Sequence, residues 1–222
     1  MKVAALIPAL NEGATIGEVV ERILPHVDQA VVVDDGSTDC TAQAARTAGA
    51  EVIVHPRNAG KGQAVRSGLQ RILAADYTHV LMLDGDLQHL PEEAPRLLQA
   101  ARATGADLVV GERQFRRDEM PASRYHANRI GSRALSGFMG VPLGDTQCGY
   151  RVFTTAMVRR MKLRATGYDI ETEMLVKLGR LGGRIEHVPV TAVYGVRSKL
   201  RPVRDTTRTC FRAVYYRFIE PV

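Results

Sequence analysis

The sequence lacks several features that would point to common classes of function. It has no tryptophan, and aromatic residues make up only 5% of its 222 positions. No run of lysine and arginine is interleaved with the stacking aromatics that single-stranded nucleic acid binders use, so nucleic acid is not an expected partner. The histidines show no metal-ligand spacing such as His-Glu-x-x-His, which argues against a histidine-based metal site.

Cysteine and long apolar runs are equally scarce. The three cysteines, Cys40, Cys148 and Cys210, are far apart, form no Cys-x-x-Cys pair and suggest a reducing compartment. No stretch approaches the roughly 18 apolar residues of a membrane span, and strand-like sequence begins at once, without a signal peptide. We therefore expect a cytoplasmic protein, and peripheral contact with the inner face of the cell membrane stays open.

The overall composition is that of an ordinary globular protein, with more basic than acidic residues. Hydrophobic residues make up 45% and charged residues 24%, and the length suits one well-buried core. The formal net charge of +6 favours an anionic partner. Such a partner could be nucleic acid, a phosphorylated substrate or an anionic membrane surface. Because nucleic acid is disfavoured above, a phosphorylated substrate and a membrane surface remain.

Short apolar runs alternate with amphipathic stretches through the first half of the chain. Val-rich runs without polar alternation are typical of parallel strands covered on both faces, and alternation with helices predicts an open, doubly wound α/β sheet. The expected strands are residues 3–8, 30–34, 52–55, 79–83 and 108–110, and the expected helices are residues 15–24, 38–48, 62–74 and 92–103.

The second half is less regular. A polar, Arg-rich loop is expected over residues 111–121, a helix over 124–139 and a turn leading into a strand over 144–153. A further helix is expected over 171–181 and a strand over 185–194, where Pro189 marks a sheet edge or a break.

Carboxylates gather where several of these strands end. The stretch LMLDGDLQ at residues 81–88 is an apolar run that ends in Asp84 and Asp86, with Gly85 between them. Two carboxylates at the end of a strand can hold one hard divalent cation, and Gln88 can add a neutral oxygen. The alternative is a plain Asp-Gly turn before a helix. Ligands of such sheets bind beyond the carboxyl ends of the strands, which favours the functional reading.

Seven motifs in one order resemble the metal-dependent family 2 glycosyltransferases, and most of all the dolichol-phosphate mannosyltransferases and their bacterial polyprenyl-phosphate relatives. The resemblance implies a GT-A fold, a mostly parallel Rossmann-like sheet flanked by helices, and a C-terminal amphipathic helix. The motifs are IPALNE at 7–12, VDDGSTD at 33–39, NAGKGQAVRSG at 58–68, DGDLQ at 84–88, GER at 111–113, DTQCGYRVF at 145–153 and SKL at 198–200.

The same resemblance implies a binding site for a nucleoside diphosphate sugar and for Mg²⁺ or Mn²⁺. Asp84, Asp86 and Gln88 match the metal positions, and through the ion they would reach the diphosphate. We expect Ser37 or Thr38 to cap a helix and Asp35 to be free for the ligand. A contact of Lys61 with phosphate, at a helix N-terminus, is left open. The donor-binding residues implied are Pro8, Asn11, Glu12, Asp35, Lys61, Asp84, Gly85, Asp86 and Lys199.

The acceptor implied by the resemblance is a polyprenyl phosphate. Hydroxyl-directed relatives commonly carry a Glu-Asp pair where this chain has Thr146 and Gln147, as the phosphate-directed group does. A phosphate monoester is largely dianionic at neutral pH and needs no general base, only cations that hold it. Arg113 matches a substrate-contacting arginine, and Arg129 and Ser132 are placed by approximate position. The arginines that cluster here are Arg113, Arg116, Arg117, Arg124, Arg129 and Arg133.

Two regions of the second half leave alternatives open. Lys199 matches a lysine that reaches toward the donor phosphates, although an arginine expected ahead of it is replaced by Val193, and Arg197 is the candidate substitute. We expect a catalytic domain over residues 1–200 and an amphipathic helix over 201–222. Its aromatic and basic residues suit either a membrane interface or the protein's own core.

The sequence thus predicts an inverting glycosyltransferase in which Asp86, Arg113 and Arg129 carry the reaction. Hexose would pass from a GDP-mannose or UDP-glucose type of donor to a polyprenyl phosphate. The alternatives are a family 2 enzyme with a saccharide or other hydroxyl acceptor, using Asp145 or Asp169 as the base, and a non-catalytic nucleotide-sugar-binding protein.

Overall fold

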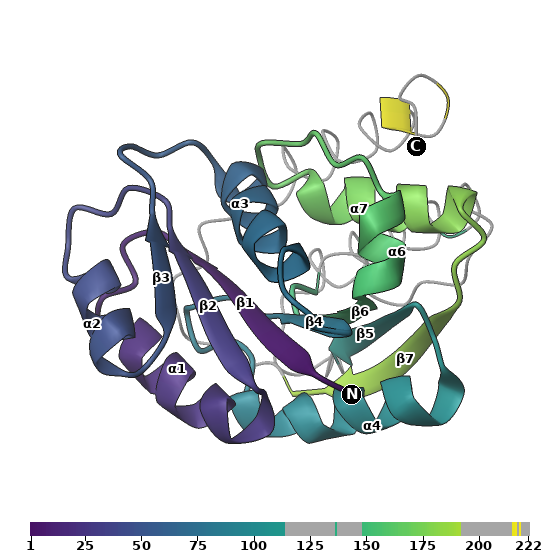
Figure 1. The fold of residues 1–222 in the computed structure, drawn as a ribbon, viewed down its shortest axis with the longest axis horizontal. Coiled ribbons are helices and arrows are strands. Elements are labelled where there is room, and N and C mark those ends of the chain that lie inside the picture. The colour runs from purple at the N-terminus through teal and green to yellow at the C-terminus, as the bar shows by residue number, and fades with distance from the viewer. Residues whose placement is uncertain (114–135, 137–147, 192–214, 217, 219–222) are drawn as a thin grey trace, which may run out of the picture.

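The structure is a computed structural model, and it describes residues 1–113, 136, 148–191, 215, 216 and 218. The strands of this part of the chain form one sheet in the order β3-β2-β1-β4-β6-β5-β7 (Figure 1). Only β6 runs antiparallel to its neighbours, β4 and β5, and every other pairing is parallel. The strands are β1 (Val3–Ala9), β2 (Gln29–Asp34), β3 (Glu51–Val54), β4 (His79–Met82), β5 (Leu108–Arg113), β6 (Arg151–Thr154) and β7 (Ile185–Val190).

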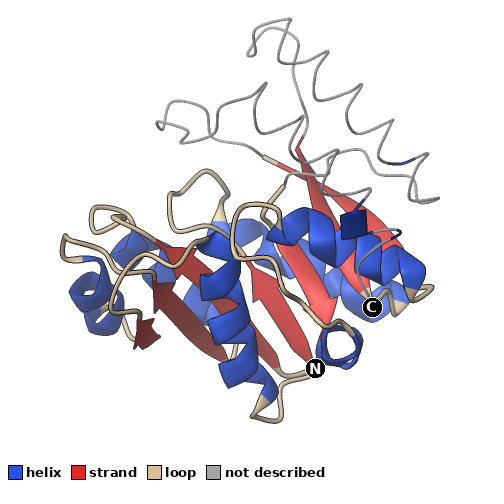
Figure 2. Ribbon diagram, turned by 90° about the horizontal axis from the view of Figure 1, so that it is seen from above, coloured by secondary structure: helices blue, strands red, loops and turns tan. Residues whose placement is uncertain are grey.

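Helices cover both faces of this sheet (Figures 1 and 2). The helices α3, α6 and α7 pack with one set of strand side chains, and α1, α2 and α4 pack with the other. Alternate residues of β1 illustrate the division, because Ala4 and Leu6 belong to the first core and Ala5 and Ile7 to the second. The helices are α1 (Ile16–Ile23), α2 (Thr41–Thr47), α3 (Lys61–Leu73), α4 (Ala94–Thr104), α6 (Thr155–Arg160) and α7 (Ile170–Arg180), with short 3₁₀ turns at Leu24–His26 and Pro91–Glu93.

The α/β class and the mostly parallel sheet are confirmed, and so is every element expected within residues 1–113. One helix begins later than predicted, at Thr41 instead of residue 38. The reason is Asp39, whose Oδ1 accepts hydrogen bonds from the Thr41 amide at 3.0 Å and the Thr41 hydroxyl at 2.5 Å. The expected cap at Ser37 or Thr38 is therefore wrong, since both precede the helix in a turn.

The second half is confirmed in part. The expected strand at Pro189 is β7, which forms the edge of the sheet beside β5. Helix α6 was not predicted, because its six residues are too few to show a period and they follow directly on β6. The first residues of the predicted loop, 111–113, instead extend β5. The rest of that loop, and the predicted helix 124–139 apart from the helical Ser136, lie outside the described residues.

Tyr216, one of the few residues described near the C-terminus, packs against α7. The Tyr216 side chain is 2% exposed, its hydroxyl donates to Asp169 Oδ2 at 2.6 Å, and Arg180 Nη1 donates to its carbonyl at 2.8 Å. Phe218 is 72% exposed. One residue of this segment therefore faces the core and another faces outward. Among the described residues, we find no helix with the length and apolarity needed to cross a bilayer.

Candidate functional site

The loops that follow β1 and β2 are linked through Asn11. Asn11 adopts a left-handed backbone conformation with φ of 53°. Its amide donates to Ser37 Oγ at 2.9 Å, and its side-chain oxygen accepts from the Thr38 amide at 2.9 Å. The next amide, of Glu12, donates to Thr41 Oγ1 at 2.9 Å. These bonds set the shape of the carboxyl edge of the sheet at β1 and β2.

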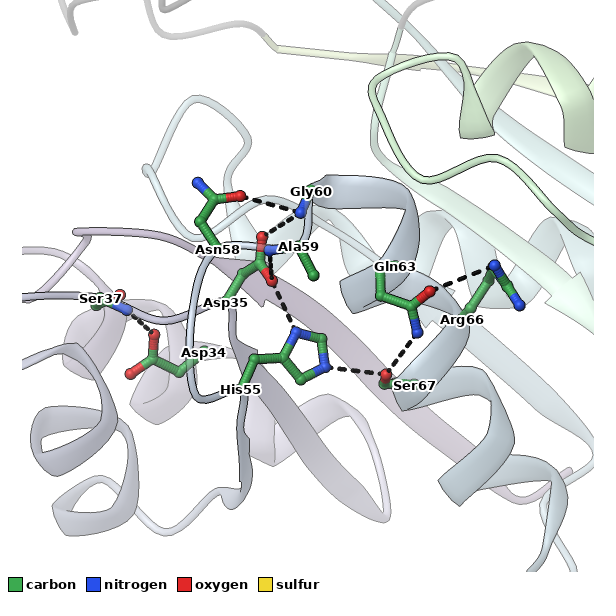
Figure 3. A network of polar contacts seen from close by, with 10 residues as sticks. All are labelled: Asp34, Asp35, Ser37, His55, Asn58, Ala59, Gly60, Gln63, Arg66 and Ser67. Carbon is green, nitrogen blue, oxygen red and sulfur yellow. Dashed lines mark hydrogen bonds and ion pairs between the residues drawn. The ribbon is translucent and has the colours of Figure 1, made fainter.

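Asp35 lies one residue past β2 and is 3% exposed. Its Oδ1 accepts hydrogen bonds from His55 Nδ1 at 2.7 Å and the Ala59 amide at 3.0 Å, and its Oδ2 accepts from the Gly60 amide at 2.8 Å (Figure 3). These three donors hold both carboxylate oxygens in place, and the expected role of Asp35 toward a ligand stays a prediction.

The N-terminus of α3 is closed by a carbonyl group. The Thr166 oxygen accepts from the Gly62 amide at 2.9 Å and from the Gln63 amide at 3.3 Å. A side chain at Gly60 or Gly62 would collide with the backbone of Ala165 and Thr166, so both positions require glycine. Asp35 and Thr166 therefore accept from three amides at this end of the helix, those of Gly60, Gly62 and Gln63, and phosphate binding by Lys61 stays a prediction.

Lys61 joins two carboxylates that are distant in sequence. Its Nζ lies 2.7 Å from Asp84 Oδ1 and 2.7 Å from Glu171 Oε1, on α7. Burial works against its charge, but Asp84 and Glu171 outweigh burial and hold the pKa of Lys61 above its ordinary value. Lys61, which is predicted to contact the nucleotide-sugar donor, thus lies beside Asp84, where the start of α3 meets the loop after β4.

Asp84 lies between the Lys61 ammonium and the backbone at Gly149. A Cβ at Gly149 would lie 2.6 Å from Asp84 Oδ2, so only a glycine lets the chain pass this close. Burial alone would raise the pKa of Asp84, but Lys61, and after it His89 and Arg151, hold that pKa below its ordinary value. The carboxylate is consequently ionised at neutral pH.

Asp86 has a different electrostatic environment. Burial, and then the negative charge of Asp84, raise the pKa of Asp86 above its ordinary value, and Glu12 adds to the effect. Its Oδ1 accepts from the Gln88 amide at 3.1 Å. Between the two aspartates, the Gly85 carbonyl accepts from Thr15 Oγ1 at 2.7 Å, which fastens this turn to the start of α1.

This donor set fits a hard divalent cation. It offers carboxylate and amide oxygens, and Asp86 lies in a negative field that a cation would relieve. No group of three or more His, Cys, Asp or Glu side chains is arranged to hold an ion within the described ranges. A cation would therefore need oxygens from a ligand in addition to those of the protein.

Three residues of this region were missed by sequence reasoning, namely His55, Arg151 and Glu171. Arg151 is fully buried, and it donates to the carbonyl of Cys148 at 2.7 Å and to that of Glu171 at 3.1 Å. Glu171 meets Lys61 across 110 positions of sequence, and no local signal encodes such a contact.

Other predicted site residues are placed with less detail. Pro8 pairs with Val33 inside the sheet, and Arg113 is the last residue of β5, opposite Val190. The remaining candidates lie outside the described residues, and their roles stay predictions: Arg116, Arg117, Arg124, Arg129, Ser132, Arg133, Asp145, Thr146, Gln147, Arg197 and Lys199.

Comparison with known proteins gives consistent results. Residues 4–167 match the model of the family described as Glycosyl transferase family 2. The chain is 36% identical over 211 residues to the glycosyltransferase AglJ of Haloferax volcanii, covering 91% of this chain and 68% of that protein. It is 34% identical over 206 residues to an undecaprenyl-phosphate mannosyltransferase of Micrococcus luteus, covering 87% of this chain and 84% of that protein.

A solved structure resembles the whole chain. It is glucosyl-3-phosphoglycerate synthase from Mycobacterium tuberculosis in complex with Mn²⁺, UDP-glucose and phosphoglyceric acid. The TM-score is 0.75 at 26% sequence identity, and the match covers 100% of this chain and 81% of that one.

Proposed function

The chain belongs to glycosyl transferase family 2, and we propose that it moves a hexose from a nucleoside diphosphate sugar to a polyprenyl phosphate. It is a glycosyltransferase with the GT-A fold. The choice of acceptor rests on the relatives, which include the undecaprenyl-phosphate mannosyltransferase and a dodecaprenyl-phosphate galacturonate synthase.

The observation that carries the proposal is the charged corner at the carboxyl end of β4. There Lys61 bridges Asp84 and Glu171 at 2.7 Å each, and Asp86 lies in the field of Asp84. The Lys61 ammonium is a fixed positive charge, and the Asp86 carboxylate favours a cation beside it. Together they suit a diphosphate that binds with a metal ion.

We assign Asp84, Asp86 and Gln88 to the binding of Mg²⁺ or Mn²⁺. The Mn²⁺ of the glucosyl-3-phosphoglycerate synthase structure supports a divalent ion in such a site. When bound, the ion supplies positive charge to the departing nucleoside diphosphate. Lys61 and Lys199 are assigned to the diphosphate. Pro8, Asn11, Glu12, Asp35 and Gly85 are assigned to the rest of the donor.

The reaction would be one in-line displacement with inversion. An oxygen of the acceptor phosphate attacks the anomeric carbon, and the bond from that carbon to the diphosphate oxygen breaks. The acceptor is dianionic at neutral pH because its second pKa is about 6. No proton has to be removed, and the task of Arg113, Arg129 and Ser132 is to hold the phosphate in line.

We place the catalytic domain at residues 1–200 and the amphipathic helix at 201–222. The acceptor lies in a membrane, and we propose that this helix makes peripheral contact with it. Tyr215 and Phe218 are 38% and 72% exposed, so aromatic side chains are available on the outer side of the segment. Tyr216 lies on the opposite side of the segment, where it packs on α7 and leaves the exposed side available for the membrane.

The test is a transfer assay with GDP- and UDP-sugars, undecaprenyl or dolichyl phosphate, and Mn²⁺ present or chelated. A lipid-linked sugar that forms only with the metal is expected, whereas the free polyprenol should accept none. Asp86→Ala should abolish turnover. The matched control is Asp76→Ala, because Asp76 is an exposed aspartate paired with Lys2 and precedes β4, whereas Asp86 follows that strand. Normal metal-dependent turnover by Asp86→Ala would disprove the site.

A second candidate is transfer to a hydroxyl group of a small acceptor. It is favoured by the structural likeness to a synthase solved with phosphoglyceric acid. Such a reaction needs a base, for which Asp145 and Asp169 are the candidates. Asp169 accepts a hydrogen bond from Tyr216 in this structure. Adding 3-phosphoglycerate and free saccharides to the assay separates the two functions. A glycosylated hydroxyl product without any lipid-linked product, lost in Asp169→Asn, would replace the first proposal.

A further inference from the structure

A chain of polar side chains runs from the middle of α3 to Asp35, and no step of the transfer reaction uses it. We propose that His55, supported by Ser67, is a positioning residue that fixes the Asp35 carboxylate as an acceptor for the nucleoside of the donor. The inference rests on the proposed function, since it assumes that a nucleotide binds beside Asp35.

The geometry is that of three side chains in line (Figure 3). His55 follows β3, with Nδ1 at 2.7 Å from Asp35 Oδ1 and Nε2 at 2.9 Å from Ser67 Oγ on α3. The imidazole is 13% exposed and the Asp35 side chain 4%. The contact therefore joins β2, β3 and α3 in a place that water scarcely reaches.

The direction of the hydrogen bonds follows from chemistry. An ionised carboxylate only accepts, so Nδ1 carries a proton and donates to Asp35. On a neutral ring Nε2 then accepts from the Ser67 hydroxyl. The Ser67 oxygen in turn accepts from Gln63 Nε2 at 3.4 Å, and Gln63 Oε1 accepts from Arg66 Nη1 at 3.3 Å. In this series of hydrogen bonds, each donor points along the path from Arg66 to Asp35.

The capacity of Asp35 defines what it can still bind. A carboxylate has about four acceptor positions. His55, Ala59 and Gly60 fill three of them within the described part of the chain, which leaves one on Oδ2. A nucleoside hydroxyl or base N–H can take that position. Without His55, Oδ1 would lose the shorter of its two described hydrogen bonds, and within the described part of the chain the Ala59 and Gly60 amides alone would set the torsion of the carboxylate.

A purely structural role would make His55 one of several links between α3 and β3. Arg71 and Glu51 form another such link, with Arg71 Nε at 2.5 Å from Glu51 Oε1. This ion pair joins the same two elements without touching Asp35. Arg71→Ala is therefore a matched control for the packing of α3 on β3.

The experiment compares His55→Gln, His55→Asn, Ser67→Ala and Arg71→Ala with the wild type. Binding of GDP and of UDP is measured by calorimetry in Mg²⁺, thermal unfolding is followed for each variant, and kcat and KM are measured for the donor. An asparagine amide can take the place of Nδ1, whereas a glutamine amide reaches the position of Nε2. His55→Asn thus keeps the bond to Asp35, and His55→Gln keeps only the bond to Ser67.

We expect His55→Gln to weaken binding of the preferred nucleotide by about 10-fold, through KM and with kcat unchanged. Ser67→Ala and His55→Asn should each cost about threefold or less, and Arg71→Ala should bind as the wild type does. A His55→Gln protein that binds as tightly as the wild type would overturn the positioning role, with nucleotide binding itself intact. Equal losses in His55→Gln and Arg71→Ala would also overturn it, since packing would then explain both. If the wild type binds neither nucleotide, the proposed function fails and this inference fails with it.

Discussion

Replacing Glu173 with leucine should be among the most destabilising single changes in this protein. Glu173 and Lys177 form an ion pair of 2.8 Å on α7, and both side chains are 0% exposed. The same carboxylate accepts from the amides of Arg164 and Ala165, at 2.9 Å and 2.8 Å. Glu173 thereby holds the segment whose next carbonyl, that of Thr166, closes the N-terminus of α3.

The expected magnitude follows from what leucine leaves behind. Removing one partner of a buried ion pair costs about 3–5 kcal/mol. Leucine also removes the carboxylate that accepts from the two amides, although Lys177 still donates to the Lys162 carbonyl at 2.5 Å. We expect a loss of about 4 kcal/mol or more, which lowers Tm by roughly 8–16 °C for a chain of this length. Lys177→Met should cost less, because the two amides still satisfy Glu173.

Urea unfolding of the two single variants and of the double variant measures this directly. The double variant should cost less than the sum of the singles by about 2 kcal/mol or more. The matched control is Glu92→Gln, which breaks an exposed pair with Arg22 and should cost no more than about 1 kcal/mol. A Glu173→Leu protein as stable as Glu92→Gln, or single effects that simply add, would show that the buried pair does not stabilise the fold in this way.

Two further predictions concern the site. Asp86→Asn should raise the Tm of the metal-free protein at neutral pH, because burial and Asp84 raise the pKa of Asp86 and make its charge costly. The gain should vanish as the pH falls below the ordinary carboxyl pKa, and a Tm difference that is constant with pH would contradict this. Gly62→Ala should lower Tm, because its Cβ would lie 2.5 Å from the Ala165 carbonyl oxygen. Gly17→Ala, with its nearest neighbour at 3.9 Å, should raise Tm slightly, and equal effects at the two glycines would argue against the close packing described.

Much of the fold could be predicted because its signals are local. The apolar runs that form β1, β2 and β4 are buried on both faces, so they contain no polar alternation. The placement of Asp35 and Asp84 at one edge followed from the parallel direction of those strands. Helix α6 and the antiparallel β6 could not be predicted with the same ease, since β6 pairs with strands on both sides that lie far away in sequence.

The site shows the same division more sharply. That Asp84 and Asp86 lie past the end of a strand is a property of the sequence stretch itself. The unlike electrostatics of the two aspartates come from Lys61 beside Asp84 and from the charge of Asp84 beside Asp86. The sequence predicts Asp35 as a ligand-binding residue, but nothing near it in the sequence indicates its contact with His55, because that contact depends on how β3 meets β2.

The sequence by itself determined the α/β class, the family and the strand-end location of the acidic residues, because hydrophobic periodicity and motif order are local properties. Only the tertiary structure decided which groups face one another. It placed Glu171 on Lys61, His55 on Asp35 and the Thr166 carbonyl on the first turn of α3. The physical reason is that hydrogen bonds and ion pairs act over a few ångströms, whereas the residues they join here are 20 to 110 positions apart along the chain.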